Sequence, residues 1–275
     1  MIETEAQIRD RVRRAQAHYG SNLSTLNGLL MIERDYASKT PTDEDVVVLM
    51  SGGLDSSVLV QKVIGEFNVK VHPLFIKRGS RNQEFEEQAF DFFADFYKKR
   101  FPNNFFEPKK LNYEVPPNEL KADFPPALAK TIGHPLRNST MQNLAVMYAV
   151  SLQTKGVEAK TIFAGSVYED NTEPELGLLS LRAQTVATCI EMGDWRWNIT
   201  SPLTDPYLTN ACVSKVDLIK YAFDTFVPIE RTRTCFGSEP EACGTCNACQ
   251  TRIAAFEEAG LPDNITYRRI VNEKI

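Results

Sequence analysis

Apolar residues form two kinds of pattern along the chain: short continuous runs and longer stretches with helical spacing. Residues 45–50 (DVVVLM) are a β-branched run without polar alternation, which is typical of a parallel strand buried on both faces. Residues 82–101 place Phe85, Phe93 and Phe96 at helical spacing, which predicts an amphipathic helix with its aromatic side chains in the core. Further strands are expected at 70–77, 111–115, 161–164 and 196–200, and further helices at 140–155 and 213–226.

This alternation of strands and helices predicts an α/β protein. It indicates βαβ units with right-handed crossovers, and therefore a five-stranded parallel sheet with helices on both faces. Residues 1–44 are expected to form a helical extension, residues 45–230 the α/β domain, and residues 231–275 a C-terminal region packed on the same domain. Residues 116–135 are rich in proline and are expected to be irregular. Pro73 predicts an irregular strand, or one whose nitrogen at this position faces no partner.

The first strand leads into a segment of small and hydroxylated side chains, SGGLDSS. Gly52 and Gly53 tolerate positive φ and let the backbone approach a ligand closely. A helix is expected to begin directly after them, and its free N–H groups and dipole favour an anion. The segment therefore predicts a phosphate-binding loop. The alternative is an ordinary strand–turn–helix capped by Ser51 or Asp55, without a ligand. The residues of the candidate loop are Leu49, Met50, Ser51, Gly52, Gly53, Leu54, Asp55, Ser56, Ser57 and Val58.

Four of the six cysteines form a second candidate site, with the spacing C-x7-C-x2-C-x2-C. Four thiolates complete a closed tetrahedral shell, which predicts a structural zinc ion. An iron–sulfur cluster and a redox dithiol are the alternatives. Cys189 and Cys212 are isolated in the sequence, and both are expected to be buried as small apolar residues. The candidate metal ligands are Cys235, Cys243, Cys246 and Cys249.

Composition restricts the compartment and the kind of partner. The chain has 275 residues, 43% of them hydrophobic and 24% charged, as in ordinary globular proteins. Its formal net charge of -5 argues against broad nucleic-acid binding, which requires many phosphate-neutralising cations. The N-terminal segment is charged and no apolar run reaches the length of a membrane helix, so a cytoplasmic protein without membrane contact is expected. Cysteines in that compartment are expected to be thiols or metal ligands.

The segment SGGLDSS resembles the SGGxDS signature of the PP-loop ATP pyrophosphatases, and no GxxxxGK[ST] motif is present. The C-terminal segment CGTCNACQTR adds a resemblance to the 7-cyano-7-deazaguanine synthase (QueC-like) family, over about residues 45–260. This resemblance implies a Rossmann-like fold of the adenine nucleotide alpha hydrolase (HUP) type. It also implies that ATP is split between its α and β phosphates, and that the protein is a homodimer.

The same resemblance assigns roles to single residues. The loop would bind the phosphates of ATP, and Gly165, which resembles the family's glycine at a strand end, would be a further ATP-binding residue. Asp55, Arg137 and Lys215 are the implied catalytic residues, with Asp55 acting through a Mg²⁺ ion and the other two facing phosphate charge. Family members convert 7-carboxy-7-deazaguanine, ammonia and ATP into the nitrile through an acyl-adenylate, so catalysis would depend on positioning and electrostatics. The implied substrate contacts are Asn138, Asp170 and Arg81.

The segment after Asp170 departs from the family pattern. It reads NTEPELGLLSLRAQ, where the synthases have a YPDCR stretch that contacts the deazaguanine. The acceptor therefore stays open between ammonia and an amine on a protein partner. The second case resembles the QueC-like proteins of antiphage operons, some of which are thought to attach a deazaguanine to a protein. Two further alternatives are a PP-loop tRNA-thiolation enzyme, disfavoured by the net charge, and a non-catalytic zinc-stapled interaction protein, disfavoured by the intact loop.

Overall fold

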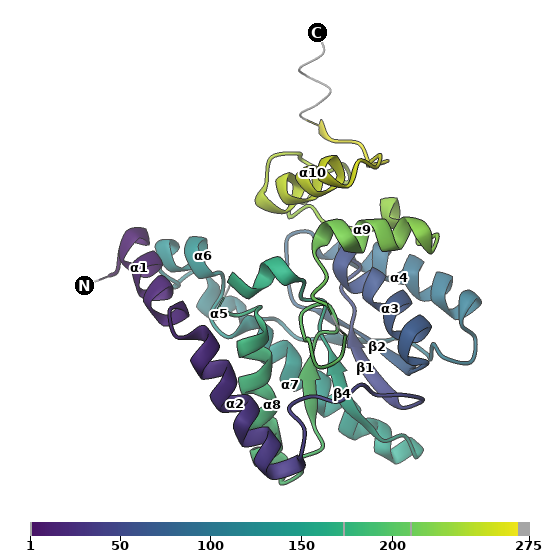
Figure 1. Cartoon of the computed structure of the whole chain (residues 1–275). Coiled ribbons are helices and arrows are strands. Elements are labelled where there is room, and N and C mark those ends of the chain that lie inside the picture. The colour runs from purple at the N-terminus through teal and green to yellow at the C-terminus, as the bar shows by residue number, and fades with distance from the viewer. Residues whose placement is uncertain (1, 173, 210, 269–275) are drawn as a thin grey trace.

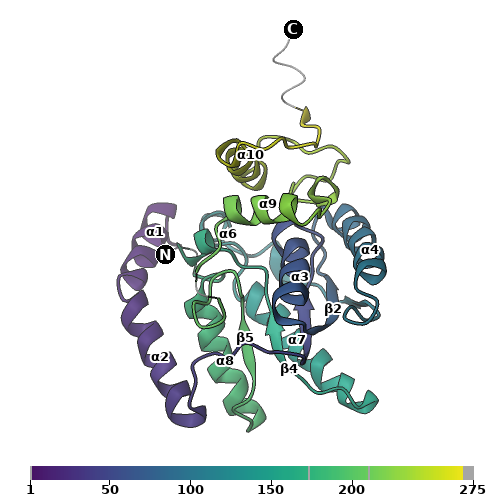
Figure 2. The ribbon, with the colours of Figure 1, turned by 45° about the vertical axis from the view of Figure 1, so that its right-hand side comes forward.

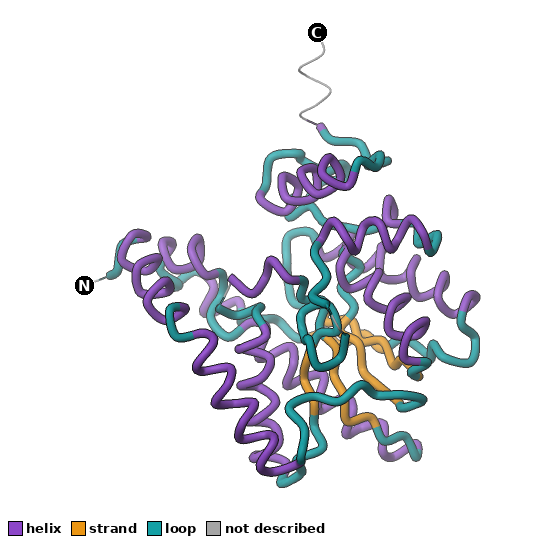
Figure 3. The backbone as a smooth tube through the Cα atoms, viewed as in Figure 1, coloured by secondary structure: helices purple, strands orange, loops and turns teal. Residues whose placement is uncertain are grey.

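A computed structural model describes residues 2–172, 174–209 and 211–268. Its centre is one five-stranded sheet with the strand order β3-β2-β1-β4-β5, in which every pairing is parallel (Figure 3). The predicted α/β fold with a five-stranded parallel sheet is therefore confirmed. The strands are β1 (Asp45–Leu49), β2 (Lys70–Lys77), β3 (Lys109–Asn112), β4 (Ala159–Phe163) and β5 (Asn198–Thr200).

Helices cover both faces of this sheet (Figures 1 and 2). Val46 and Val48 of β1 pack into one core with the first layer, while Val47 between them packs into a second core with the other layer. This division follows from the alternation of side chains along a strand, and it explains why the run has no polar positions. The first layer contains α3 (Leu54–Phe67), α4 (Gln83–Arg100) and α9 (Lys215–Asp224), and the second contains α7 (Arg137–Leu152) and α8 (Leu178–Met192).

The order of the strands places the candidate loop at the switch point of the sheet. β2 and β3 lie on one side of β1, whereas β4 and β5 lie on the other. The connections that leave β1 and β4 therefore run in opposite directions, and ligands in such sheets bind in the crevice between those strand ends.

Pro73 lies inside β2 without breaking its pairing to β1. The backbone of Val71 bonds to Asn104 and Phe106 on the β3 side, and residue 73 faces the same side because it is two positions further along. The ladder with β3 starts only at the pair Leu74–Lys109, so the proline nitrogen faces a gap in the pairing. Of the two outcomes predicted for Pro73, the structure therefore shows the one in which its nitrogen faces no partner.

Several boundaries differ from the prediction. β3 ends at Asn112, three residues before Val115, and α7 begins at Arg137 and continues into the 3-10 helix η1 (Gln153–Lys155). The expectation that residues 116–135 are irregular is wrong. Two short helices, α5 (Asn118–Lys121) and α6 (Pro126–Ile132), lie there, and proline fits the first turn of a helix because its missing N–H is not needed.

The N-terminal residues form two helices, α1 (Glu5–Gln16) and α2 (Tyr19–Arg34), which lie along the outer side of α6 and α8 (Figure 1). Thr4 begins α1 with a capping box, and Ile8 is buried. The guanidinium of Arg34 donates to the carbonyl oxygens of Trp195 and Trp197, which anchors α2 to the chain entering β5. No helix in the described part of the chain is long and apolar enough to cross a membrane.

In the C-terminal region, the buried side chain of Arg252 in α10 (Asn247–Ala259) joins several segments by hydrogen bonds. Its guanidinium forms a two-pronged ion pair with Asp263, at 2.9 Å for each bond, and donates to Thr232 Oγ1 at 2.7 Å. Such planar, paired bonds fix geometry as well as charge. Phe256 of the same helix enters the core under α9. Two short 3-10 helices, η2 (Tyr168–Thr172) and η3 (Ile229–Arg231), complete the described elements.

Candidate functional site

The glycines of the candidate loop allow a close approach of three chain segments. Gly52 has φ +75, and a Cβ at this position would lie 2.5 Å from the carbonyl oxygen of Glu86 and 2.7 Å from the nitrogen of Phe90 in α4. Both neighbours are backbone atoms of a helix and cannot move aside. Only glycine therefore fits the turn between β1 and α3.

The N-terminus of α3 has no side-chain cap. Gly53 is its N-cap, so neither Ser51 nor Asp55 has the capping role of the ligand-free alternative. Ser51 Oγ instead accepts the N–H of Gly53 at 3.3 Å and lies 3.1 Å from Ser56 Oγ. The backbone N–H groups of the first helical turn remain available to an anion at the positive end of the dipole.

Gly165, two residues after β4, lies against this helix start. A Cβ at Gly165 would be 2.9 Å from the nitrogen and 3.0 Å from the Cα of Ser56. The absence of a side chain thus lets the ends of β1 and β4 come together at the switch point. The structure thus brings Gly165 and the loop into contact.

Lys215 and Asp55 form an ion pair beside the loop. Lys215 Nζ lies 2.9 Å from Asp55 Oδ2, and the other oxygen, Asp55 Oδ1, is buried without a hydrogen-bond partner among the described residues. Burial opposes the charge on Lys215, but the carboxylates of Asp55, Asp170 and Glu169 together outweigh burial and raise the lysine pKa. The lysine is therefore held as a cation at the mouth of the loop.

Asp170 belongs to the same group of charges. Its Oδ2 accepts the N–H of Val167 at 2.9 Å, which fixes the carboxylate directly after β4. Burial, assisted by the negative charge of Asp55, raises the pKa of Asp170 to about 6. A carboxyl group with this pKa changes its charge close to neutral pH.

Arg137 and Asn138, at the start of α7, form a second group of predicted residues. Arg137 Nη2 pairs with Glu175 Oε1, and Asn138 Nδ2 donates to the carbonyl oxygen of Glu175 at 3.3 Å. Burial lowers the pKa of Arg137, against the effect of Glu175. Within residues 2–172, 174–209 and 211–268, no ion pair or hydrogen bond joins Arg137 to Lys215 or Asp55. The predicted residues thus divide into two groups, and Arg81 is exposed outside both.

Sequence reasoning missed the residues that surround Arg137. Arg78 directly follows β2, pairs with Glu86 of α4 at 3.1 Å, and lies near enough to Arg137 and His134 to lower both of their pKa values. The signal was present, because Arg78 stands at the carboxyl end of a strand, where ligands bind in such sheets. The pairing of Glu175 with Arg137 had no local signal, since 38 positions separate them.

The four cysteines of the C-terminal region converge. Their sulfur atoms all lie within 4.8 Å of one another, and Cys243 Sγ is 4.0 Å from Cys249 Sγ. Zinc–sulfur bonds of about 2.3 Å in a tetrahedron place the sulfurs about 3.8 Å apart, so the cluster fits a metal ion of this kind. Burial opposes the charged form of Cys243, but hydrogen bonds to its Sγ from the Thr245 hydroxyl and from the N–H groups of Thr245 and Cys246 outweigh burial and lower its pKa to about 6. These bonds favour the thiolate form, which is the form that binds a metal.

The cysteine region is attached to the candidate loop by direct hydrogen bonds. The backbone N–H of Arg233 donates to the carbonyl oxygen of Gly52 at 2.9 Å. Asn82, which is buried at the start of α4, donates to the carbonyl oxygen of Cys235 and to Glu86, each at 3.0 Å. The first cysteine ligand and the loop are therefore parts of one hydrogen-bonded unit.

The two isolated cysteines have different environments. Cys189 is fully buried in α8 and lies 3.5 Å from the carbonyl oxygen of Trp197, as expected for a small core residue. Cys212 is exposed, so the prediction of its burial is wrong. Cys212 lies in the connection between β5 and α9, where its neighbour Ala211 is also exposed.

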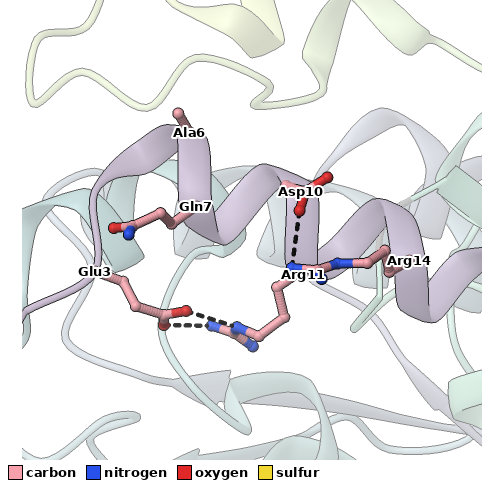
Figure 4. Close-up of a pocket in the computed structure, with 6 residues that line it drawn as sticks. All are labelled: Glu3, Ala6, Gln7, Asp10, Arg11 and Arg14. Carbon is pink, nitrogen blue, oxygen red and sulfur yellow. Dashed lines mark hydrogen bonds and ion pairs between the residues drawn. The ribbon is translucent and has the colours of Figure 1, made fainter.

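A surface hollow of about 410 Å³ lies beside α1, away from the loop (Figure 4). Its charged groups are already matched, because Arg11 pairs with Glu3 at 3.1 Å and Arg14 pairs with Asp10 at 2.8 Å. This hollow has none of the features of the site at the strand ends.

A glycine-rich loop at the switch point of a parallel sheet, an uncapped helix N-terminus and a half-buried lysine–carboxylate pair are the features of an enzyme of the PP-loop type. The sequence model of the family described as queuosine biosynthesis protein QueC matches residues 45–260. The chain belongs to the QueC family.

Two relatives show how far this similarity extends. The 7-cyano-7-deazaguanine synthase of Acetivibrio thermocellus is 30% identical over 233 residues, which are 80% of this chain and 96% of that protein. The 7-cyano-7-deazaguanine synthase of Chloroherpeton thalassium is 29% identical over 237 residues, 81% of this chain and 96% of that protein.

Among solved structures, NMN synthetase from Francisella tularensis aligns with a TM-score of 0.45 at 11% identity, over 92% of this chain and 90% of that chain. The tRNA thiolase NcsA from Methanococcus maripaludis aligns with a TM-score of 0.39 at 13% identity, over 92% and 72%.

Proposed function

We propose that this chain is an ATP-dependent ligase that adenylates the carboxylate of 7-carboxy-7-deazaguanine. In the first step a carboxylate oxygen attacks the α-phosphorus of ATP, and pyrophosphate leaves. Ammonia then attacks the acyl carbon, loses a proton and displaces AMP, which gives the amide. The amide oxygen attacks a second ATP with release of pyrophosphate. Departure of AMP with this oxygen and loss of the two N–H protons give the nitrile of 7-cyano-7-deazaguanine.

The observation that carries this proposal is the arrangement at the loop. The uncapped first turn of α3 offers N–H donors to the leaving pyrophosphate, and Lys215 supplies a half-buried cation beside it. No side-chain nucleophile is required, because the substrate carboxylate itself attacks. The residues act by holding ATP and by stabilising phosphate charge.

Asp55 is the residue that fits a Mg²⁺ ion. Carboxylate oxygens are preferred ligands of this ion, and Asp55 Oδ1 is buried without a partner among the described residues. When bound, the ion would neutralise phosphate charge. Lys215 keeps the other oxygen of Asp55 in place, so the orientation of the carboxylate does not depend on the ion.

The acceptor side of the site is assigned to Arg137, Asn138 and Asp170. Arg137 is paired with Glu175, and a substrate carboxylate of the same charge and shape would exchange with it. Asp170, fixed on the N–H of Val167, would accept hydrogen bonds from the N–H groups of the deazapurine. Arg81 is exposed, and its predicted contact with the substrate stays a prediction.

The four cysteines are proposed to hold zinc in a purely structural role. Four protein ligands leave no open position for a substrate. The hydrogen bonds from Arg233 to Gly52 and from Asn82 to Cys235 would transmit the order of this site to the loop. The metal would therefore support ATP binding without taking part in the reaction.

A second candidate uses an amine of a protein partner in place of ammonia. It is favoured by the segment after Asp170, which differs from the family pattern and forms η2 and the start of α8. The adenylation step is the same in both candidates. The homodimer stays a prediction. A tRNA-thiolation activity and a non-catalytic role stay alternatives.

One incubation tests these proposals. The purified protein is mixed with ATP, Mg²⁺, 7-carboxy-7-deazaguanine and ammonium, and the products are analysed by mass spectrometry. AMP, pyrophosphate and the nitrile are the expected products of the synthase. Formation of AMP only after addition of a protein partner would support the second candidate. No nucleotide turnover under either condition would overturn both.

A further inference from the structure

We propose that Tyr19, from the helical extension that precedes the family-matched residues, is a positioning residue for the acceptor substrate. It acts by fixing the connection between β4 and α8, which carries Asp170 and Glu175. This inference rests on the proposed function, because it assumes that the acceptor binds between these residues.

The contact between Tyr19 and this connection is specific. Tyr19 is the first residue of α2, and its hydroxyl donates to Asn171 Oδ1 at 3.1 Å and accepts the N–H of Leu179 at 3.2 Å. Asn171 Oδ1 also accepts the N–H of Leu178 at 2.9 Å. Two donors at the start of α8 are thus satisfied from outside that helix.

These bonds replace a cap that α8 lacks. Its N-cap is Gly177, which has no side chain to accept the N–H groups of the first turn. A Cβ at Gly177 would lie 3.1 Å from the Cα of Asn171, so the connection folds tightly upon itself. The place where α8 begins is therefore set by the side chains of Tyr19 and Asn171.

The same connection supplies the acceptor side of the site. One residue before Asn171, Asp170 is held on the N–H of Val167. Further along, Glu175 pairs with Arg137 and its carbonyl oxygen accepts from Asn138. A shift of the connection would therefore displace both Asp170 and Glu175.

The extension also contacts α6, the helix that precedes Arg137 in the chain. Helix α1 packs on α6, and Glu5 pairs with Lys130 at 2.9 Å. The chain that leaves α6 passes Gly133, where a Cβ would lie 3.2 Å from Glu175 Oε1. Residues 2–44, which precede the residues matched by the family model, thus contact both α6 and the connection between β4 and α8.

The glycine turn of the ATP loop is held by segments other than this connection, because Gly52 packs against α4 and its carbonyl oxygen accepts the N–H of Arg233. Lys215 does bond to the connection, but through the carboxylate of Glu169, which accepts its backbone N–H, and not through Tyr19 or Asn171. Loss of the Tyr19 hydroxyl is therefore expected to change acceptor binding and leave ATP binding unchanged. A general loss of stability would change both.

The test is the full-length Tyr19→Phe variant, with Tyr113→Phe as the control because that side chain is exposed after β3. Steady-state kinetics give KM for the deazapurine carboxylate, KM for ATP, and kcat. Tyr19→Phe is expected to raise the acceptor KM about three- to tenfold, the factor of a lost hydrogen bond, with ATP KM and kcat within about twofold of the parent. Equal changes in both KM values, or none in either, would overturn the proposal.

A second measurement separates this proposal from the proposed function. Hydrogen exchange of the apo protein is followed at residues 174–182 in the parent, in Tyr19→Phe and in Asn171→Ala. Faster exchange in both variants and a double variant no faster than the single ones are expected, because the two side chains form one cap. A parent without turnover refutes the proposed function alone, whereas unchanged exchange in Tyr19→Phe refutes the role of Tyr19.

Discussion

Lys215 Nζ lies 2.9 Å from Asp55 Oδ2, although 160 positions separate the two residues in the chain. Lys215 begins α9 directly after the capping box of Ser214, and Asp55 lies in the first turn of α3. Two helix starts are thereby joined at the switch point of the sheet. The pair places a cation beside the N–H groups of α3, where phosphate charge would develop.

Replacement of Lys215 by methionine keeps the length of the side chain and removes its charge. We expect Lys215→Met to lower the rate of pyrophosphate release about 100-fold or more, as loss of one electrostatic contact to a transition state does. Lys98→Met is the control, since Lys98 forms only an exposed ion pair with Glu107. Retention of more than about a tenth of the parent rate in Lys215→Met would contradict this role, on the same scale of magnitude.

Replacement of Gly165 by alanine tests the close approach of β4 to α3. The new Cβ would lie 2.9 Å from the nitrogen of Ser56, so the strand end and the loop would have to separate. ATP affinity, measured by calorimetry, is expected to fall about tenfold or more, because a shift of this kind costs about 1–3 kcal/mol. Gly28→Ala is the control: no atom lies within 4 Å of its Cβ position in α2, and parent affinity is expected.

Loss of one cysteine ligand tests the metal site. Cys243→Ser is expected to contain no bound metal by elemental analysis, where the parent contains one zinc per chain. Its melting temperature is expected to fall by about 10 °C or more, since the binding energy of a structural metal is folding energy. Cys212→Ser, at an exposed thiol, should leave both quantities unchanged. Iron in the parent, or full metal content in Cys243→Ser, would be the contrary result.

The raised pKa of Asp170 predicts a dependence of stability on pH. Because burial raises the pKa to about 6 from 3.8, the folded protein binds this proton more tightly than the unfolded chain. The contribution of Asp170 to the free energy of unfolding is therefore fully present below about pH 4. It decreases as the pH rises toward about 6 and is absent above that pH.

The substitution Asp170→Asn removes the carboxylate whose ionisation causes this loss of stability. At pH 7.5 the apo variant is expected to be more stable than the parent by up to about 3 kcal/mol, since one pKa unit is about 1.4 kcal/mol. The difference should shrink toward pH 4, and urea unfolding at both values measures it. Asp95→Asn on the exposed side of α4 is the control. An equal difference at both pH values would show that the charge of Asp170 is not the cause.

The sequence was sufficient for the local parts of the site. Residues 45–58 carry the strand, the turn and the helix start in one continuous segment, so their pattern predicts the loop directly. The four cysteines are also close to one another in the sequence, so their spacing predicts the cluster directly. By contrast, Arg137–Glu175 and Tyr19–Asn171 join residues that are 38 and 152 positions apart, and no local pattern contains such pairs.

Some errors have a physical cause within the sequence itself. Prolines in residues 116–135 indicated irregular structure, yet Pro126 occupies the first turn of α6, where it is well tolerated. Cys212 was assigned to the interior by residue type, but burial depends on which segments pack over a loop.

The most direct measurement follows the oxygen atoms of the substrate. The protein is incubated with ATP, ammonium and 7-carboxy-7-deazaguanine labelled with ¹⁸O in both carboxylate oxygens, and the nucleotide products are analysed by mass spectrometry. Attack of the carboxylate on the α-phosphorus predicts AMP that carries one ¹⁸O, together with unlabelled pyrophosphate. Formation of ADP and ¹⁸O-labelled phosphate, or of AMP without the label, would contradict adenylation at this loop.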